Sequence, residues 1–140
     1  MFHWLKKTES QKPTTLGQLG EEIARKEYEK KGFTIIAKNE YNKKGKRLGE
    51  IDFIAKNKTT LAFVEVKTRN SEIGFFGNPL ESVNHFKQIK ILKAVKLYLL
   101  KHQDLTSLRP QIDVCAVILQ AIDKSPVSVK IYSNAVEDWN

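Results

Sequence analysis

Two apolar segments joined by a short polar turn constrain the fold of this chain more than any other feature. Residues 48–56 and 61–67 are rich in valine, isoleucine, leucine and phenylalanine, and the turn Asn57-Lys58-Thr59 lies between them. Segments of this length and composition are typical of β-strands. Because so short a connection joins strands most simply as an antiparallel hairpin, the pattern predicts a sheet built around this pair.

Two helices are expected on either side of the hairpin in the sequence. A first helix begins after a cap at Thr14 or Thr15, and Gly32 ends it; threonine is a common N-cap and glycine a common C-terminal stop. The asparagine–proline pair at 78–79, with a glutamate three residues after the asparagine, predicts the start of a second helix that continues to about residue 101.

Further strands are expected at 33–38, 111–119 and 127–132. The resulting order is α-β-β-β-α-β-β, which predicts a three-layer α/β domain in which helices cover a mixed sheet. The length of 140 residues suits one domain. We therefore expect a flexible N-terminal tail at 1–13 and a single domain over 14–140.

Composition restricts the class of protein. The single cysteine, Cys115, excludes an internal disulfide and zinc sites of the Cys₄ or Cys₂His₂ type. No apolar run reaches the ~20 residues of a membrane span, and the N-terminus lacks the apolar stretch of a signal peptide. These features predict a cytoplasmic location and no membrane partner. The formal net charge of +8 favours an acidic partner, with nucleic acid ahead of an anionic membrane.

The hairpin carries a concentration of charged residues at spacing of two. Side chains two apart on a strand point to the same face, so Glu65 and Lys67 share one face of their strand. On the neighbouring strand Glu50 and Asp52 share a face, and Ile51 is expected on the opposite one. If Asp52 and Glu65 face the same side, two carboxylates and an ammonium meet on an otherwise apolar sheet, where charges are costly unless they are paired or bind a metal.

Two interpretations of this charged group remain open from spacing alone. The first is an ordinary cross-strand ion pair on a solvent-exposed face. The second is a site for a hard cation with a lysine nearby, which is the equipment for hydrolysing a phosphodiester. Mg²⁺ takes a few carboxylates together with waters and phosphate oxygens, the ion activates a water, and the lysine holds or deprotonates that water or stabilises developing charge.

Single residues on other elements bear on this choice without settling it. Glu21 lies at the edge of the apolar face of the first helix, either as a third acidic group or as an ordinary boundary glutamate. Lys87 interrupts the apolar stripe of the second helix, and its ammonium either reaches solvent over the core or faces a phosphate. Phe75 and Phe76, between two glycines, could form a homodimer contact, wedge into DNA or simply pack.

The order of these motifs makes the chain resemble the YraN-like family of bacterial proteins over about residues 14–119. Members of that family are usually described as predicted endonucleases related to archaeal Holliday junction resolvases. The motifs that carry the resemblance are Gly17-x-x-Gly20-Glu21-x-x-Ala24, Gly49-Glu50-Ile51-Asp52-Phe53-Ile54 and Phe63-Val64-Glu65-Val66-Lys67-Thr68-Arg69, with Asn39, Lys87 and Ile112-Asp113-Val114 in support.

The resemblance implies a restriction-endonuclease-like fold with the core order α-β-β-β-α-β, which agrees with the order expected from the residues. It also implies a metal-dependent endonuclease that hydrolyses DNA, with branched and single-stranded DNA among its candidate substrates. The implied roles are Mg²⁺, or Mn²⁺ in its place, held by Asp52, Glu65 and the Val66 carbonyl, a catalytic lysine at Lys67, and Glu21 completing the site directly or through water. Glu50, on the Asp52 face, is a candidate supporting group.

Basic residues around the hairpin are the expected contacts to DNA phosphates. This set comprises Lys43, Lys44, Lys46 and Arg47 in the turn before the hairpin, with Arg69 and Lys87. The turn is equally compatible with a solvated basic surface. The alternative function is a nucleic-acid-binding or scaffolding module that keeps the fold and cleaves little.

Overall fold

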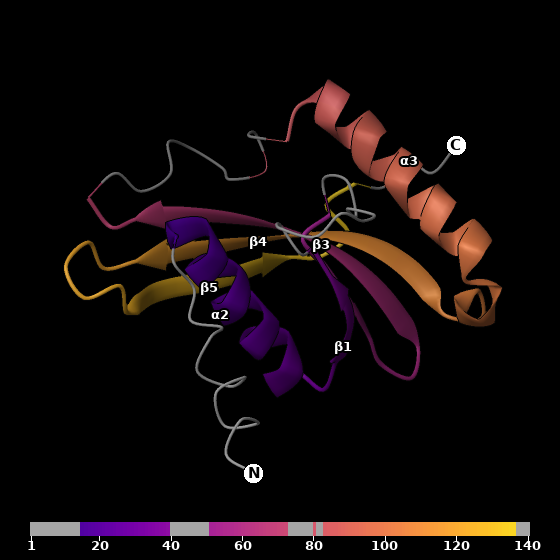
Figure 1. Ribbon diagram of the computed structural model, residues 1–140, viewed down its shortest axis with the longest axis horizontal. Helices are drawn as coiled ribbons and strands as arrows, with labels where there is room; N and C mark the ends of the chain where they lie inside the picture. Colours follow the sequence, from indigo (N-terminus) through magenta and orange to yellow (C-terminus); the bar gives the residue numbers. More distant parts are fainter. Residues whose placement is uncertain (1–14, 40–50, 73–79, 81–82, 137–140) are drawn as a thin grey trace, which may run out of the picture.

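The computed structural model of this chain describes residues 15–39, 51–72, 80 and 83–136 (Figure 1). Several predictions fall outside the described residues: the tail at 1–13, the basic turn with Lys43, Lys44, Lys46 and Arg47, Glu50, Phe75, Phe76, and the pair Asn78-Pro79. No helix among the described residues is long and apolar enough to cross a membrane.

The described elements follow the predicted order of helices and strands. They are α2 (Leu16–Lys30), β1 (Thr34–Lys38), β2 (Phe53–Lys56), β3 (Thr60–Asn70), α3 (His85–Lys101), the short 3₁₀ helix η2 (Gln103–Leu105), β4 (Arg109–Leu119) and β5 (Pro126–Tyr132). The strands form one sheet in the order β1-β2-β3-β4-β5. Only β3 and β4 pair in parallel, and the other neighbours are antiparallel. The predicted mixed sheet is therefore confirmed.

The two helices pack against opposite faces of this sheet (Figure 1). Ala24 and Tyr28 of α2 join a buried cluster with Phe53 and Val64, whereas Ile91 of α3 belongs to a second cluster. Because parallel strands need a crossover, α3 lies between β3 and β4 in the sequence. This arrangement confirms the predicted three-layer α/β fold.

Local signals fix α2 and the hairpin as expected. The Thr15 hydroxyl accepts the backbone N–H of Gln18 at 3.1 Å and caps α2. Gly32 follows the helix with φ of +91°, a conformation that side chains other than glycine rarely adopt. In the turn between β2 and β3, the Asn57 side chain accepts the backbone N–H groups of Thr59 and Thr60 at 3.0 and 2.8 Å. These contacts join the strands as the predicted antiparallel hairpin.

The predicted start of the second helix is wrong. The helix begins at His85, and its cap is Asn84, whose side chain accepts the backbone N–H of Lys87 at 2.9 Å. Asn84 has extended backbone angles, φ −72° and ψ 175°, so the helix does not extend back to residue 78. An asparagine at either position can cap a helix; Asn78 itself lies outside the described residues, and the helix that contains His85 is capped by Asn84. Leu80 and Val83 still pack into the core beneath α3.

The first strand of the hairpin also differs from expectation. It begins at Phe53 rather than at residue 48, and the described residues Ile51 and Asp52 lie just before it. Ile51 packs in the same cluster as Ile54, so the predicted alternation, which placed it with Phe53, is wrong there. The alternation breaks because the side chain of Asp52 accepts the backbone N–H of Val66 at 2.6 Å. In a regular antiparallel ladder, a backbone carbonyl accepts that N–H group.

Candidate active site

Asp52 and Glu65 come together where the hairpin strands begin to pair. Phe53 lies opposite Val64 in the ladder, so the residues on either side of this pair, Asp52 and Glu65, are neighbours across the strands. The backbone N–H of Asp52 donates to the Val64 carbonyl at 2.8 Å, and its side chain accepts from Val66. Both main chain and side chain thus fix Asp52 against β3.

The surroundings of Asp52 disfavour its charged form. Burial raises its pKa, and the negative charge of Glu65 raises it further; together with Glu21 these effects bring the value from 3.8 to about 8. The Val66 N–H acts in the opposite direction, since it stabilises the carboxylate. Glu21 raises the pKa through its charge and through a side-chain hydrogen bond to Asp52. Burial and the two neighbouring carboxyl groups thus favour the protonated form of Asp52.

A glycine allows the carboxylate of α2 to reach this point. A Cβ atom placed on Gly20 would overlap the side chain of Thr68 on β3, so the helix and the strand approach more closely than another residue would permit. The next residue, Glu21, is only 8% exposed and lies beside Asp52. The structure therefore brings together three carboxyl groups that are far apart in the sequence.

Two lysines converge on Glu65, which is 6% exposed. The Lys67 ammonium lies 3.2 Å from Glu65 Oε1, and the Lys87 ammonium, from the first turn of α3, lies 2.6 Å from the same oxygen. Burial lowers the pKa of Lys67, and a side-chain contact with Lys87 lowers it further, while Glu65 opposes the change. The ammonium of Lys87 thus faces a carboxylate of the candidate site, which neither sequence interpretation of this lysine included.

These residues suit a hard cation at two carboxylates rather than three. Among the described residues, no group of three histidine, cysteine, aspartate or glutamate side chains is arranged to hold a metal ion. Mg²⁺, however, is commonly held by one or two carboxylates and completes its shell with water and phosphate oxygens. Asp52 and Glu65, which are neighbours across the hairpin strands, are two carboxyl oxygen donors of this kind. In this structure the lysine ammonium groups provide the positive charge next to Glu65.

Asn39, for which the sequence predicted no specific role, positions the segment before β2 through two hydrogen bonds. Its side chain donates to the carbonyl of Ile51 at 2.5 Å, and its backbone N–H donates to the carbonyl of Asp52 at 3.0 Å. The residue thereby holds the segment before β2 against the end of β1. Its place in the motif order was the only signal, because a contact between adjacent strands cannot be recognised from spacing.

The other predicted DNA contact among the described residues is Arg69. It lies on β3 two residues after Lys67, and its exposed side chain donates to the carbonyl of Thr68 at 2.8 Å. Along β3, Arg69 lies four residues after Glu65, which is in the middle of the strand.

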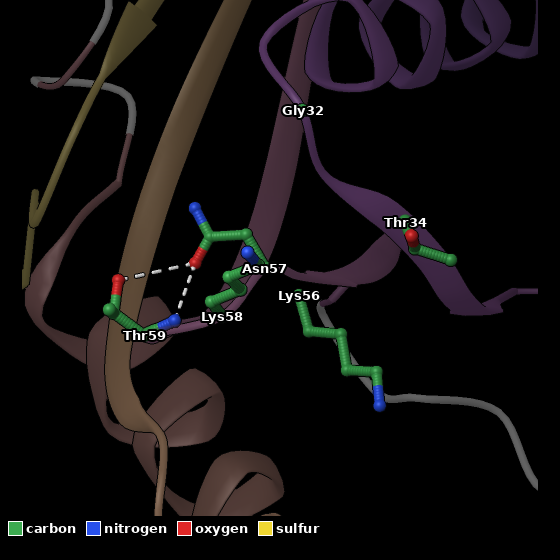
Figure 2. A pocket seen from close by; sticks show the side chains of 6 residues that line it. All are labelled: Gly32, Thr34, Lys56, Asn57, Lys58 and Thr59. Atoms are coloured by element: carbon green, nitrogen blue, oxygen red, sulfur yellow. Dashed lines mark hydrogen bonds between the residues drawn. The ribbon is translucent and has the colours of Figure 1, made fainter.

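A hollow at the opposite end of the hairpin has different chemistry (Figure 2). It has a volume of about 500 Å³ and is lined by Gly32, Thr34, Lys56, Asn57, Lys58 and Thr59. Figure 2 shows that the Asn57 side chain is engaged with Thr59 of the turn. No carboxylate is among the described residues that line this hollow, so the charged cluster at Asp52 is the stronger candidate for a site.

Fold and site together define a three-layer α/β protein with carboxyl groups and lysines clustered at one end of a central hairpin. A profile of the family described as "Uncharacterised protein family UPF0102" matches residues 20–117, a region that includes Glu21, Asp52, Glu65 and Lys67. The chain belongs to this UPF0102 family, and the resemblance to YraN-like proteins is thereby confirmed.

Relatives in two clostridial species support the same assignment. A UPF0102 protein of Clostridium botulinum strain 657 is 38% identical over 122 residues, which cover 87% of this chain and 94% of the relative. One from Clostridium kluyveri is 35% identical, with 87% and 93% coverage. Another, from Clostridium botulinum strain Kyoto, is 40% identical, with 87% and 94% coverage. These matches establish the family and do not by themselves establish a reaction.

Proposed function

We propose that this protein is a metal-dependent endonuclease that hydrolyses phosphodiester bonds of DNA in the cytoplasm, with Mg²⁺ as its cofactor and Mn²⁺ as a substitute. The observation that carries the proposal is the position of Asp52, which lies beside Glu65 across the hairpin and contacts Glu21 of α2, so that burial and these two carboxyl groups raise its pKa. A cluster of repelling carboxyl groups is unfavourable for the fold alone, and such perturbed groups concentrate at functional sites.

The ligands of the metal follow from the donor set. Asp52, Glu65 and the Val66 carbonyl would hold the ion, and Glu21, which contacts Asp52, would act on it through water. When bound, the ion lowers the pKa of a water and neutralises charge on the phosphate. The carboxyl groups of the protein would orient the reacting water by accepting its hydrogen atoms, and the lysine ammonium groups would attract the phosphate toward it.

The lysines have complementary roles toward the substrate. A lowered pKa allows Lys67 to accept a proton from the attacking water nearer to neutral pH than an ordinary lysine could. Lys87 and Arg69 would contact phosphates flanking the scissile bond, as would the basic residues of the turn before the hairpin. The net charge of +8 supports a polyanionic substrate. Branched and single-stranded DNA are the substrate forms to test first.

A nucleic-acid-binding or scaffolding module is the second candidate, and one observation favours it. Glu65 already has two ammonium partners, so its charge is balanced without any metal ion. A module of this kind would keep the lysines on Glu65 when DNA binds and would show no dependence on divalent cations.

A cleavage assay separates the two candidates. Purified protein is incubated with single-stranded, duplex, flap and four-way DNA, with and without Mg²⁺ or Mn²⁺. Asp52→Asn is the test variant, and Asp104→Asn, at an exposed position after α3, is the matched control. Metal-dependent cleavage by the wild type and the control, and none by Asp52→Asn, is the expected result. Binding without cleavage of any of the four substrates would exclude the nuclease in favour of the module.

A further inference from the structure

The side of α3 that faces away from the sheet is apolar, which the core does not explain. Four of its side chains are exposed: Phe86 77%, Ile89 49%, Leu97 50% and Leu100 68%. At 3.6 residues per turn these four and Lys93 fall within an arc of about 80°. The buried residues of α3, Ile91 and Val95, lie on the opposite side of the helix. A surface helix normally carries polar residues in that outer position.

Lysines line both edges of this apolar stripe. By the same helical geometry Lys90 and Lys101 lie along one edge and Lys96 along the other, while Lys93 interrupts the middle, and all four are exposed. The 17 residues of α3 include no aspartate or glutamate. The outer face of α3, defined by these lysines and the four apolar residues, therefore combines exposed apolar area with an unbroken positive charge.

Two adjoining hollows lie along this face, between Ile89 and the residues that follow α3. One, of about 370 Å³, is lined by Ile89, Leu92, Lys93, Lys96, Leu97 and Leu100. The other, of about 550 Å³, is lined by Lys96, Leu99, Leu100, Gln103 and Thr106. Hollows between side chains receive the protruding residues of a partner helix, spaced three and four apart. A flat bilayer surface would leave them unfilled.

We propose that the outer face of α3 binds an amphipathic helix of another protein whose polar edges carry aspartate and glutamate. The apolar stripe from Phe86 to Leu100 extends about 21 Å along the axis, the length of four helical turns. Carboxylates at the edges of the partner would pair with Lys90 and Lys96, and one near its centre would pair with Lys93. Apolar burial would supply the affinity, and the charges would select the partner.

A second copy of this chain is a poorer occupant of the same face. A two-fold axis through the middle of the stripe would bring the two Lys93 ammonium groups together and would set lysine edges against lysine edges. Such like-charge contacts disfavour a complex. DNA complements the charge but offers no apolar surface to cover the leucines.

The proposal is independent of the proposed nuclease. Lys87 points from the other side of α3 toward Glu65, so a helix bound to the outer face would leave the carboxyl cluster accessible. Loss of cleavage and loss of helix binding can therefore be observed separately.

Synthetic peptides of roughly 18 residues test the proposal, because a helix of that length spans the stripe. The first peptide carries leucines at three- and four-residue spacing with glutamates beside them. The second replaces the glutamates by lysines, and the third replaces the leucines by glutamines. Binding of each to the full-length protein is measured by fluorescence anisotropy. The acidic leucine peptide is expected to bind saturably, and the other two at least about tenfold more weakly.

Protein variants locate the binding face. Leu97→Gln with Leu100→Gln should weaken binding of the acidic peptide at least about tenfold, because two apolar contacts are lost. Ile122→Gln, at the most exposed large apolar residue elsewhere among the described residues, is the matched control and should bind as the wild type. Circular dichroism confirms that the variants fold, and Leu100→Gln alone serves as the milder change.

Charge reversal tests the second half of the proposal. Lys93→Glu with Lys96→Glu should shift the preference from the acidic to the basic peptide, whereas Lys58→Glu in the hairpin turn should not. The proposal is overturned if no saturable binding appears below about 1 mM, the limit of a weak specific complex. It is also overturned if the protein with Leu97→Gln and Leu100→Gln binds the acidic peptide as tightly as the wild type does. Two other results would overturn it: sedimentation that shows two copies joined through this face, or flotation of the protein with phosphatidylglycerol vesicles when it does not bind the peptides.

Discussion

Replacing Asp52 by asparagine should remove a pH-dependent loss of stability that we expect of the wild type. The raised pKa means that folded Asp52 keeps its proton up to about pH 8, whereas unfolded Asp52 releases it near 3.8. The stabilisation due to this proton is complete below about pH 4 and is lost as the pH rises to about 8. Asparagine has the same shape, can still accept the Val66 N–H and can donate to Glu21, and it does not titrate.

The size of the effect follows from the pKa values. One pKa unit corresponds to about 1.4 kcal/mol, so the interval from 3.8 to about 8 has an upper limit of roughly 5–6 kcal/mol. Solvent relaxation around a carboxyl group that is not fully buried reduces the expected value to about 2–4 kcal/mol. Asp52→Asn should therefore match the wild type near pH 4 and exceed its stability by about 2–4 kcal/mol near pH 8.

Urea unfolding at pH 4, 5, 6, 7 and 8 measures the difference for the wild type, Asp52→Asn and the control Asp104→Asn. The difference between the curves reports the titration of Asp52 together with its coupling to Glu65 and Glu21. Parallel pH profiles for the wild type and Asp52→Asn would refute the reasoning, because Asp52 would then titrate normally. Saturating Mg²⁺ at pH 8 should restore the free energy of unfolding of the wild type and leave that of Asp52→Asn unchanged.

Three further predictions concern the neighbours of this carboxyl group. Lys67→Ala should keep Mg²⁺-dependent thermal stabilisation but lower the single-turnover cleavage rate by ~10²–10⁴-fold, because a proton-transfer or charge-stabilising group is lost; an unchanged rate would contradict its role. Lys87→Met should tighten Mn²⁺ binding measured by calorimetry several-fold, because one ammonium no longer competes for the glutamate of β3, whereas Lys90→Met on the outer face of α3 should leave it unchanged. Gly20→Ala should lower the free energy of unfolding by about 1–3 kcal/mol, because the new Cβ would overlap a threonine of β3. Gly17→Ala is the control in the same urea experiment. Its new Cβ would lie 4.0 Å from its nearest neighbour, so this change should be neutral or stabilising.

The sequence predicted those parts of the fold that depend on short-range signals. The cap at Thr15, the stop at Gly32 and the polar turn between the hairpin strands each act within a few residues, and each is present as expected. The start of α3 was misassigned because two asparagines six residues apart carry the same local signal. Local sequence signals therefore do not decide between them.

The sequence did not predict the features of the site that depend on contacts between distant residues. The bond from Val66 to the Asp52 side chain joins residues 14 positions apart, and it breaks the alternation that spacing alone would impose on Ile51. Likewise, Lys87 meets Glu65 only because α3 crosses that face of the sheet. The sequence did not indicate the apolar outer face of α3, because a helix that is apolar on two sides has no clear hydrophobic periodicity.

The most direct test of the proposed metal-dependent activity is calorimetric titration of Mg²⁺ and Mn²⁺ into the wild type and Asp52→Asn, with and without DNA. The carboxyl pair of Asp52 and Glu65 predicts saturable binding to the wild type at pH 8, with proton release that grows as the pH is lowered toward 6, because the ion displaces the proton of Asp52. Asp52→Asn should give no such heat. Equal and negligible heats for both proteins, with DNA as well as without it, would contradict the nuclease and favour the binding module.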